Sequence, residues 1–550
     1  MTSQIIAGPD SVRVMLTGMR DVARVARISL GPSGRGTVIE HVGRLAPIFT
    51  KDGRTIAQAM KYQDPGHNVG LKFLTQAAGV LDRQIGDGSN TAIVMTHAMA
   101  IEVGRLLATN LSAREICRGM VEARDIALGS LESGVRRVTE HNLKHLALTY
   151  ANQDESIARL TSEAFESVGQ EGDVSAEFGG GVEDELEVVE GARYDKGYAS
   201  PVFCTNKTQK RVELEHPLFL ITDHPITDFQ CLVDPLELAV QAGRPLVLIA
   251  ESVGEEALAA LVMNHVRGKI RCAVAGPPMF GETRTDALED IAILTGGRPF
   301  LERQGDVIQA VKLADLGQAD KVVMDAESTT IIGGRGCPQN KRARIATVLG
   351  RRLALHSETR SMTGRVDLEE KLADRLRMLS EKSAKLRVGG ANDTQIRYRL
   401  RVAEKAIGAT RAALESGVVA GGGAAYFRAA QEIEMRLAGE ENLARRAGLR
   451  AVALALKAPR TAILASVGEG SLASQPNEDV WFGWDVRSRR DDVDLWEARI
   501  ADPLNQCRLT LSVAVSLCES LCNVSVMVLK TLPEIDDFSP EMAAATREVM

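Results

Sequence analysis

The stretch Gly86-Asp87-Gly88-Ser89-Asn90-Thr91 lies between two segments of helical periodicity, residues 67–84 and an apolar series that begins at Ala92. Glycines let a backbone approach a ligand closely, and the N–H groups of a helix N-terminus can bind phosphate. A carboxylate in such a loop repels phosphate unless a cation lies between them, so Asp87 fits a Mg²⁺ ligand. The competing interpretation is a well-capped helix that binds nothing.

Length and composition narrow the class of protein. The chain has 550 residues, which predicts about three or four domains. A net charge of −7 and 4% aromatic residues argue against a dedicated nucleic-acid binder. The first residues lack a signal-peptide pattern, and no apolar run is long enough to span a bilayer. Eight scattered cysteines without zinc spacing are typical of reduced thiols, so we expect a cytoplasmic protein that contacts no membrane.

The periodicity changes twice along the chain. Both ends are mainly helical, with a first amphipathic helix expected at residues 10–28. From residue 191 to about 380, short apolar strands alternate with helices, which indicates an α/β domain. Within that part, the charged stretch Val366–Lys385 is expected to form a helical arm. The predicted fold class is therefore a multidomain α plus α/β protein in which one domain is inserted into another.

Further motifs occur in a fixed order around the opening loop. They are Leu30-Gly31-Pro32-Ser33-Gly34-Arg35, Thr50-Lys51-Asp52-Gly53, Tyr194-Asp195-Lys196-Gly197-Tyr198, Asp290-Ile291-Ala292-Ile293-Leu294-Thr295-Gly296-Gly297, Ala409-Thr410-Arg411-Ala412-Ala413 and Gly417-Val418-Val419-Ala420-Gly421-Gly422-Gly423. In this order they resemble the group I chaperonins, the GroEL/Hsp60 family. The resemblance covers roughly residues 5–533.

The resemblance implies three domains and a ring. It implies an equatorial domain at 1–133 and 417–550, an intermediate domain at 134–190 and 384–416, and an apical domain at 191–383. It also implies a homo-oligomeric heptameric ring, single or double, which non-native protein clients enter and a co-chaperonin lid can close.

By the same resemblance, the equatorial domain binds ATP with Mg²⁺ and K⁺. The implied nucleotide-binding residues are Ser29, Leu30, Gly31, Pro32, Lys51, Asp87, Gly88, Ser89, Asn90, Thr91, Gly422, Asp485, Val486 and Asp502. Asp87 would hold Mg²⁺, Asp502 would contact the ribose, and Asp485 and Val486 would lie near adenine. Asp52 matches an acid that positions the attacking water.

Two positions of the site depart from the family. A second water-orienting acid is expected just before Ala409, but Lys405 stands there, flanked by Glu404. An ammonium group cannot accept the hydrogen bonds that order water, although it can neutralise phosphate charge. Glu404 could substitute only if the helix rotated, because adjacent helical residues point about 100° apart. Asn90 replaces the usual threonine, which puts the K⁺ contact in question.

The client-binding surface and the C-terminus depart as well. The resemblance implies client binding by Tyr198, Phe203, Val233, Leu236, Leu258, Val262 and Met263. Leu258, Val262 and Met263 share one helical face, which could instead be core. Val202 replaces an aromatic residue, Pro235 interrupts a groove helix, and the tail from Phe538 lacks the family's Gly-Gly-Met repeat.

Three functions remain open at this point. The first is an ATP-dependent folding chaperonin. The second is a specialised paralogue with weak or no ATP hydrolysis, a holdase or assembly factor for a dedicated client such as a monooxygenase component. The third, a metabolic enzyme on the inserted domain, lacks any nucleophile–base pair to support it.

Overall fold

The computed structural model describes residues 2–40, 47–109, 111–169, 172–206, 209–279, 281–354, 368, 371–372, 374–376, 378–379, 382–469 and 479–531. The chain divides into two compact units. Unit 1 combines Met1–Arg159 with Ala391–Met550, and unit 2 is Leu160–Gly390. A smaller domain is thus inserted between the two halves of a larger one. The three-domain division of the sequence is finer than this and stays a prediction.

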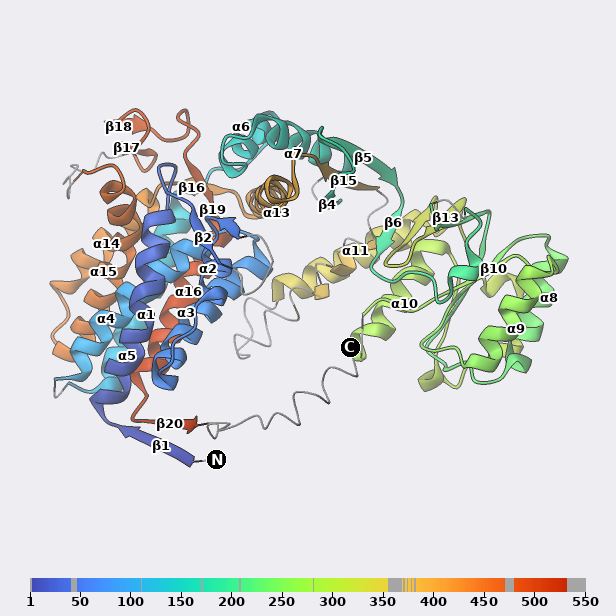
Figure 1. The fold of residues 1–550 in the computed structure, drawn as a ribbon, viewed down its shortest axis with the longest axis horizontal. Coiled ribbons are helices and arrows are strands. Elements are labelled where there is room, and N and C mark those ends of the chain that lie inside the picture. Colours follow the sequence, from blue (N-terminus) through green and yellow to red (C-terminus); the bar gives the residue numbers. More distant parts are fainter. Residues whose placement is uncertain are drawn as a thin grey trace, which may run out of the picture. The chain divides into compact units, whose positions relative to one another are not determined.

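Unit 1 is a helical assembly drawn from both ends of the chain (Figure 1). Its helices are α1 (Pro9–Ser29), α2 (Gly53–Ala59), α3 (Pro65–Gln84), α4 (Ser89–Leu107), α5 (Ala113–Ser133), α6 (Glu140–Tyr150), α13 (Asp393–Ser416), α14 (Ala424–Leu437), α15 (Leu443–Ala465) and α16 (Leu504–Cys522). Helix α7 (Glu155–Val168) crosses the boundary between the units. Helix α15 packs on α5, α16 on α4 and α1 on α3. Fully buried side chains such as Met19, Leu74 and Met95 fill one continuous apolar core.

Short antiparallel strand pairs border these helices. They are β1 (Thr2–Ala7) with β20 (Val526–Thr531), β2 (Thr37–Ile39) with β3 (Ile48–Thr50), β16 (Val418–Ala420) with β19 (Ala501–Pro503), and β17 (Phe482–Asp485) with β18 (Arg490–Asp494). The β16–β19 pair matters most for the site, because it joins two segments that are distant in sequence.

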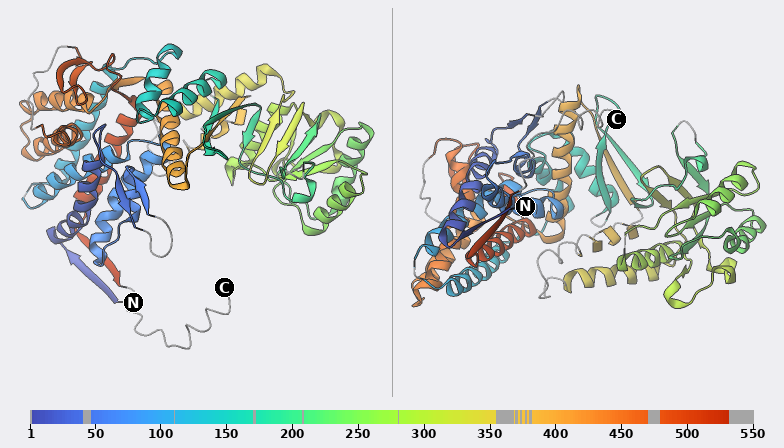
Figure 2. Two further views of the ribbon diagram at one scale, coloured as in Figure 1. Left: turned by 45° about the horizontal axis from the view of Figure 1, so that its top comes forward. Right: turned by 60° about the horizontal axis from the view of Figure 1, so that its bottom comes forward.

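The centre of unit 2 is a mainly parallel sheet with strand order β10-β9-β8-β11, on which β12 (Gly317–Gln318) pairs antiparallel with β8. The parallel strands are β8 (Leu218–Thr222), β9 (Leu246–Ile249), β10 (Cys272–Ala275) and β11 (Pro299–Phe300). Every residue of β8, β9 and β10 is buried, as expected for a sheet covered on both faces. Helices α8 (Val233–Gln241), α9 (Glu255–Val266) and α10 (Glu282–Thr295) connect the strands and pack on this sheet (Figure 1, Figure 2).

Two further sheets complete unit 2. One is antiparallel, with the order β6 (Ala192–Tyr194), β14 (Thr329–Ile332), β13 (Lys321–Met324) and β7 (Val212–Glu215). The other has the order β4 (Asp173–Phe178), β15 (Lys382–Val388) and β5 (Glu185–Glu190). The remaining elements are α11 (Pro338–Ala354) and the 3₁₀ turns η1 (Pro201–Phe203), η2 (Phe229–Leu232), η3 (Glu302–Gln304), η4 (Ile308–Ala310) and η5 (Leu313–Asp315).

The predicted fold class is confirmed, with one local error. Residues Lys382–Lys385 were expected in a helical arm but begin strand β15. Alternation explains this, because Ala384, Leu386 and Val388 are buried while the residues between them are charged or polar. Most of the rest of that arm, and the tail from Phe538, lie outside the described residues.

Two predicted absences concern the described residues. No helix among them is both long enough and apolar enough to cross a bilayer. All eight cysteines are described and each is a free thiol; Cys272, Cys507, Cys518 and Cys522 are buried, and the other four are at least partly exposed.

Candidate functional site

Three turns of unit 1 meet at the loop that opens helix α4. The Asn90 side chain donates a hydrogen bond from Nδ2 to the Lys51 carbonyl oxygen at 2.9 Å. A Cβ atom on Gly53 would lie 2.3 Å from Asn90 Oδ1, so glycine permits this close approach. The turn before α2 and the turn before α4 are therefore in direct contact, as the resemblance implies.

Helix α4 presents a free N-terminus to this meeting point. Its N-cap is Gly88, at a φ of +88°, and no side chain caps the first turn. The first N–H groups of a helix lack partners within the helix and favour an anion. Ser89, Asn90 and Thr91 lie in this first turn, but the Ser89 hydroxyl donates to the Ala78 carbonyl oxygen at 3.4 Å. The backbone therefore supplies most of the anion-binding character.

The β16–β19 pair brings a third segment, which contains Asp502, to the site. Asp502 lies opposite Val419 in this pair, and the Gly421 N–H donates to the Ile500 carbonyl oxygen at 2.9 Å. The pairing places Asp502 beside the turn that contains Gly422, at a φ of +64°. Helix α16 begins directly after Asp502 and Pro503, and its Gln506 Cγ would lie 3.0 Å from a Cβ on Gly88. The turn of Gly422, Asp502 and the loop at Gly88 thus form one neighbourhood.

Several buried polar atoms in this neighbourhood have no hydrogen-bond partner. They are Asn90 Oδ1, Gln506 Oε1, Thr410 Oγ1 and Tyr150 Oη. Buried polar groups are normally satisfied, so a cluster of unpartnered ones indicates a polar ligand. An adenine nucleotide, rich in donors and acceptors, fits this requirement.

Three of these residues were missed by the sequence analysis. Thr410 lies in a motif that was recognised, but it received no role. Gln506 and Tyr150 carry no local signal. Tyr150 nevertheless lies close to the site residues. Burial, and then the charges of Asp502, Cys507 and Asp87, raise the pKa of its phenol well above the ordinary value.

Lys405 closes the site from helix α13. Its Nζ atom lies 3.0 Å from Asp52 Oδ1 and 3.5 Å from Asp87 Oδ1. Asp52 caps helix α2, accepting hydrogen bonds at Oδ2 from the Thr55 N–H and the Thr55 hydroxyl. Lys405 thus bridges the two acids that the resemblance assigns to water and to Mg²⁺.

These ion pairs control the charge of Asp52. Burial alone would raise its pKa, but the positive charges of Lys405 and then Arg401, with the Thr55 hydrogen bonds, hold the pKa well below its usual range. Burial likewise opposes the charge of Lys405, yet Asp87 and Asp52 raise the pKa of Lys405 overall. Both groups are therefore ionised at neutral pH.

Glu404 is engaged elsewhere. Its carboxylate accepts a hydrogen bond from Arg401 Nη1 at 2.9 Å, and its side chain is 43% exposed. Arg401 also pairs with Asp82, a buried acid that Arg54 contacts as well. The alternative in which Glu404 replaces the missing acid is therefore not the arrangement observed.

The remaining nucleotide residues lie around this centre or next to it. Ser29 is the last residue of α1 and Leu30 to Pro32 follow it, and a Cβ on Gly31 would meet Ile463 of α15 at 3.1 Å. The Asp485 carboxylate accepts hydrogen bonds from the N–H groups of Arg487 and Ser488, and Val486 belongs to the apolar core. The adenine contact of Asp485 and Val486 stays a prediction.

The acids suit a divalent cation less well than the sequence suggests. Asp87 has a partly exposed carboxylate, but one of its oxygens already faces the Lys405 ammonium. Mg²⁺ ligation by Asp87 therefore stays a prediction that requires Lys405 to move away. As arranged, the anion site fits a nucleotide, whereas the pair Asp52 and Asp87 does not fit an added divalent cation.

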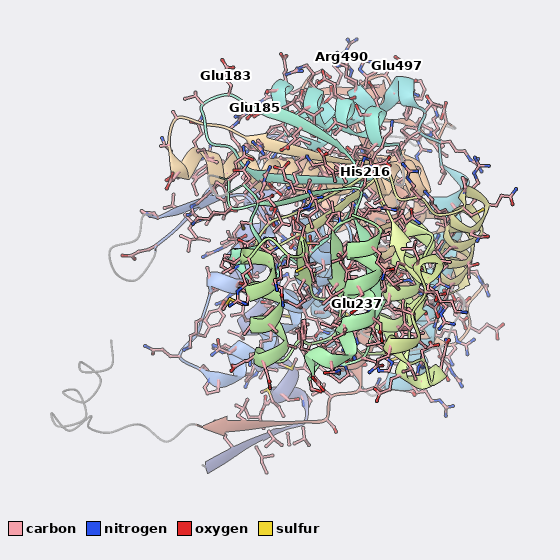
Figure 3. The ribbon with its side chains drawn as sticks, turned by 90° about the vertical axis from the view of Figure 1, so that its right-hand side faces the viewer. Glu183, Glu185, His216, Glu237, Arg490 and Glu497 are labelled. Carbon is pink, nitrogen blue, oxygen red and sulfur yellow. The ribbon has the colours of Figure 1, made fainter. Side chains whose placement is uncertain are left out.

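The predicted client-binding residues all lie in unit 2. Phe203 and Leu236 are fully or almost fully buried in its core, and the Phe203 ring packs edge-on against His265. Tyr198, Val233, Leu258 and Val262 are partly buried, and Met263 is 50% exposed. Glu237 marks helix α8 in Figure 3. The accessible part of the predicted set thus lies mainly on α8 and α9.

Comparison with known proteins defines the class. A model of the TCP-1/cpn60 chaperonin family matches residues 22–531, so the chain belongs to this family, as the resemblance predicted. It is also similar to two crystal structures of the chaperonin gp146 from the bacteriophage EL 2 (Pseudomonas aeruginosa), obtained in the presence of ATP-BeFx. Identities are 21% and 22%, TM-scores are 0.69 and 0.75, and each match covers 96% of this chain and 99% of the other. At this identity the likeness establishes the shared fold.

The pKa of Asp502 leads to a testable pH dependence. Burial and the charge of Asp87 raise this pKa from 3.8 to about 7. Between these values the folded state keeps a proton that the unfolded state has lost, so this group makes stability fall as pH rises. Asp502→Asn should therefore raise the melting temperature of the nucleotide-free protein by several degrees at pH 8 and by less at pH 5. Differential scanning calorimetry showing the same shift at both pH values would contradict the assignment.

Proposed function

We propose that this protein is a chaperonin that binds non-native polypeptides and assists their folding in an ATP-dependent ring cavity. The observation that carries the proposal is the convergence of glycine turns on unpartnered buried atoms such as Gln506 Oε1 and Asn90 Oδ1. That gp146 was crystallised with ATP-BeFx supports an adenine nucleotide as the ligand. A cytoplasmic heptameric ring, single or double, and a co-chaperonin lid belong to the same proposal.

Exposed apolar residues support self-association. Strands β1 and β20 form a two-stranded ribbon on which Ile5, Val526 and Val528 are exposed. A two-stranded ribbon is marginal alone, and unpaired strand edges favour contact with another chain. Size-exclusion chromatography with light scattering should show a large ring, and monomer alone, with and without ATP, would contradict the proposal.

A second candidate function is favoured by Lys405. Because this residue pairs with Asp52 and Asp87 instead of ordering water, hydrolysis should be slow or absent. The protein would then act as a holdase or as an assembly factor for a dedicated client, such as a monooxygenase component. ATP turnover measured beside client range separates this function from general folding.

Client capture can be tested on helix α9. Met263→Glu places a charge in the predicted apolar surface, so we expect it to lose most of its suppression of aggregation of a chemically denatured test protein, measured by light scattering. Val182→Glu is the matched control, because Val182 is an exposed apolar residue of the same unit (71%) and lies between β4 and β5, not on α8 or α9. Equal loss in both variants would contradict client binding at the predicted apolar surface.

Nucleotide binding can be tested at Gly88. Alanine there must adopt a φ of +88° at a cost of about 1–2 kcal/mol, and its Cβ would crowd Gln506. Gly88→Ala should weaken ATP binding about tenfold, as measured with a fluorescent analogue. Gly281→Ala is the control, since Gly281 also has a positive φ but nothing lies within 4 Å of its added Cβ. Unchanged affinity in Gly88→Ala would exclude this loop from the site.

A further inference from the structure

The Lys405 ammonium lies where two carboxylates from separate turns converge. Asp52 precedes α2 and Asp87 precedes α4, and Nζ is within 4 Å of an oxygen of each. The Lys405 side chain is 16% exposed and that of Asp52 is 2% exposed, so the contact is largely shielded from solvent. Two converging carboxylates beside an anion site would ordinarily attract a divalent cation.

Charge balance argues against adding a metal ion to this arrangement. Lys405 pairs with both Asp52 and Asp87, and Arg401, which also pairs with Asp82 and Glu404, lies 3.5 Å from Asp52. A divalent cation between the same oxygens would sit next to an ammonium group in a largely buried place, where like charges repel strongly. Lys405 donates up to three hydrogen bonds and accepts none, so it cannot itself ligate a metal.

A second N–H donor occupies a neighbouring oxygen. Asn90 Nδ2 donates to the Lys51 carbonyl oxygen, an acceptor that would otherwise be open to a cation or to water. Next to the α4 N-terminus, Lys405 thus contacts the Asp52 and Asp87 carboxylates, and Asn90 contacts the Lys51 carbonyl oxygen.

We propose that Lys405 is a built-in counter-cation of the nucleotide site, so that this chaperonin binds nucleotide phosphates without recruiting a divalent metal ion. The inference rests on the proposed nucleotide-binding function. The phosphates would be held by the free N–H groups at the start of α4 and by Lys51, while Lys405 keeps Asp52 and Asp87 from repelling them.

The test compares ATP affinity with Mg²⁺ and with EDTA, using the full-length protein and isothermal titration calorimetry. The native protein should bind with affinities that differ less than about threefold between the two buffers. Lys405→Met removes the charge and should lose about tenfold or more in EDTA relative to Mg²⁺. Lys457→Met is the control, because Lys457 pairs with Glu434 on the surface of unit 1 and should keep the native behaviour.

Metal binding alone gives a readout independent of nucleotide. Mn²⁺ titration followed by electron paramagnetic resonance should detect no site at these acids in the native protein and one site in Lys405→Met. Lys405→Gln, which keeps N–H donors without the charge, should also gain the site if Lys405→Met fails to fold. Native Mn²⁺ binding that Asp87→Asn abolishes, or a tenfold Mg²⁺ requirement in the native protein, would overturn the inference. Absence of ATP binding in both buffers would overturn the proposed function as well.

Discussion

Lys405→Asp is expected to raise steady-state ATP hydrolysis by about two orders of magnitude, the contribution typical of a well-placed acid–base group. The native ammonium neutralises Asp52 and Asp87 and accepts no hydrogen bond from water. An aspartate would remove that cation, free both acids and add an acceptor on the same face of α13. The assay is phosphate release with Mg²⁺ and K⁺ present.

Two controls identify the source of the gain. Lys405→Met frees the acids without adding an acceptor, so it should gain much less than Lys405→Asp. Asp52→Ala in the Lys405→Asp background should remove the gain, because Asp52 would then be the second acid near the water. Native turnover typical of ATPases, abolished by Asp52→Ala, would instead mean that the lysine is tolerated and that the ordinary folding cycle operates.

The largest effect on stability is expected at Asp290 of unit 2. Its carboxylate is 1% exposed and accepts hydrogen bonds from Arg375 Nε at 2.6 Å, Arg375 Nη2 at 3.0 Å and Arg344 Nε at 2.6 Å. Asp290→Ala would leave the buried Arg375 guanidinium with Asp286 as its remaining acidic partner. Breaking a buried pair on one side costs about 3–5 kcal/mol, and we expect the lower end because Asp286 remains.

Hydrogen exchange measures this loss without requiring two-state unfolding of the whole chain. The opening free energy of α10 amides should fall by about 3 kcal/mol in Asp290→Ala. Asp320→Ala is the control, since Asp320 pairs with Arg335 at an exposed site and should cost less than about 1 kcal/mol. Unchanged protection of α10 would mean that the buried cluster contributes no net stability.

Elements with strong local signals were predicted closely. The amphipathic period placed α1 within one residue at each end, and strands such as β9 (Leu246–Ile249) lie in the part of the chain where short apolar strands were predicted. The strand at Lys382 was missed because the charged or polar residues Lys382, Ser383 and Lys385 at its start hide an alternation that only packing in the β4–β15–β5 sheet makes decisive.

The site was predictable in its turns but not in its contacts. Glycine spacing and the family resemblance predict the loops of Gly31, Gly88 and Gly422 as parts of the site. The sequence also identified Lys405 as a departure, but its partners depend on how α13 lies against turns more than 300 positions earlier in the chain. Tyr150 and Gln506 could not be found at all, because burial without a partner is a property of the folded chain.

The split origin of unit 1 sets an order of events during synthesis. Its core needs α16, which packs on α4 and is the last of the described helices to leave the ribosome. At a synthesis rate of about 5–20 residues per second, α1 to α5 are complete on the order of tens of seconds before α16, and their apolar faces stay uncovered during that time. Leu160–Gly390, in contrast, is continuous and complete well before the chain ends. A nascent subunit therefore passes through a stage in which its inserted domain is folded while its larger domain is still an exposed client for other chaperones.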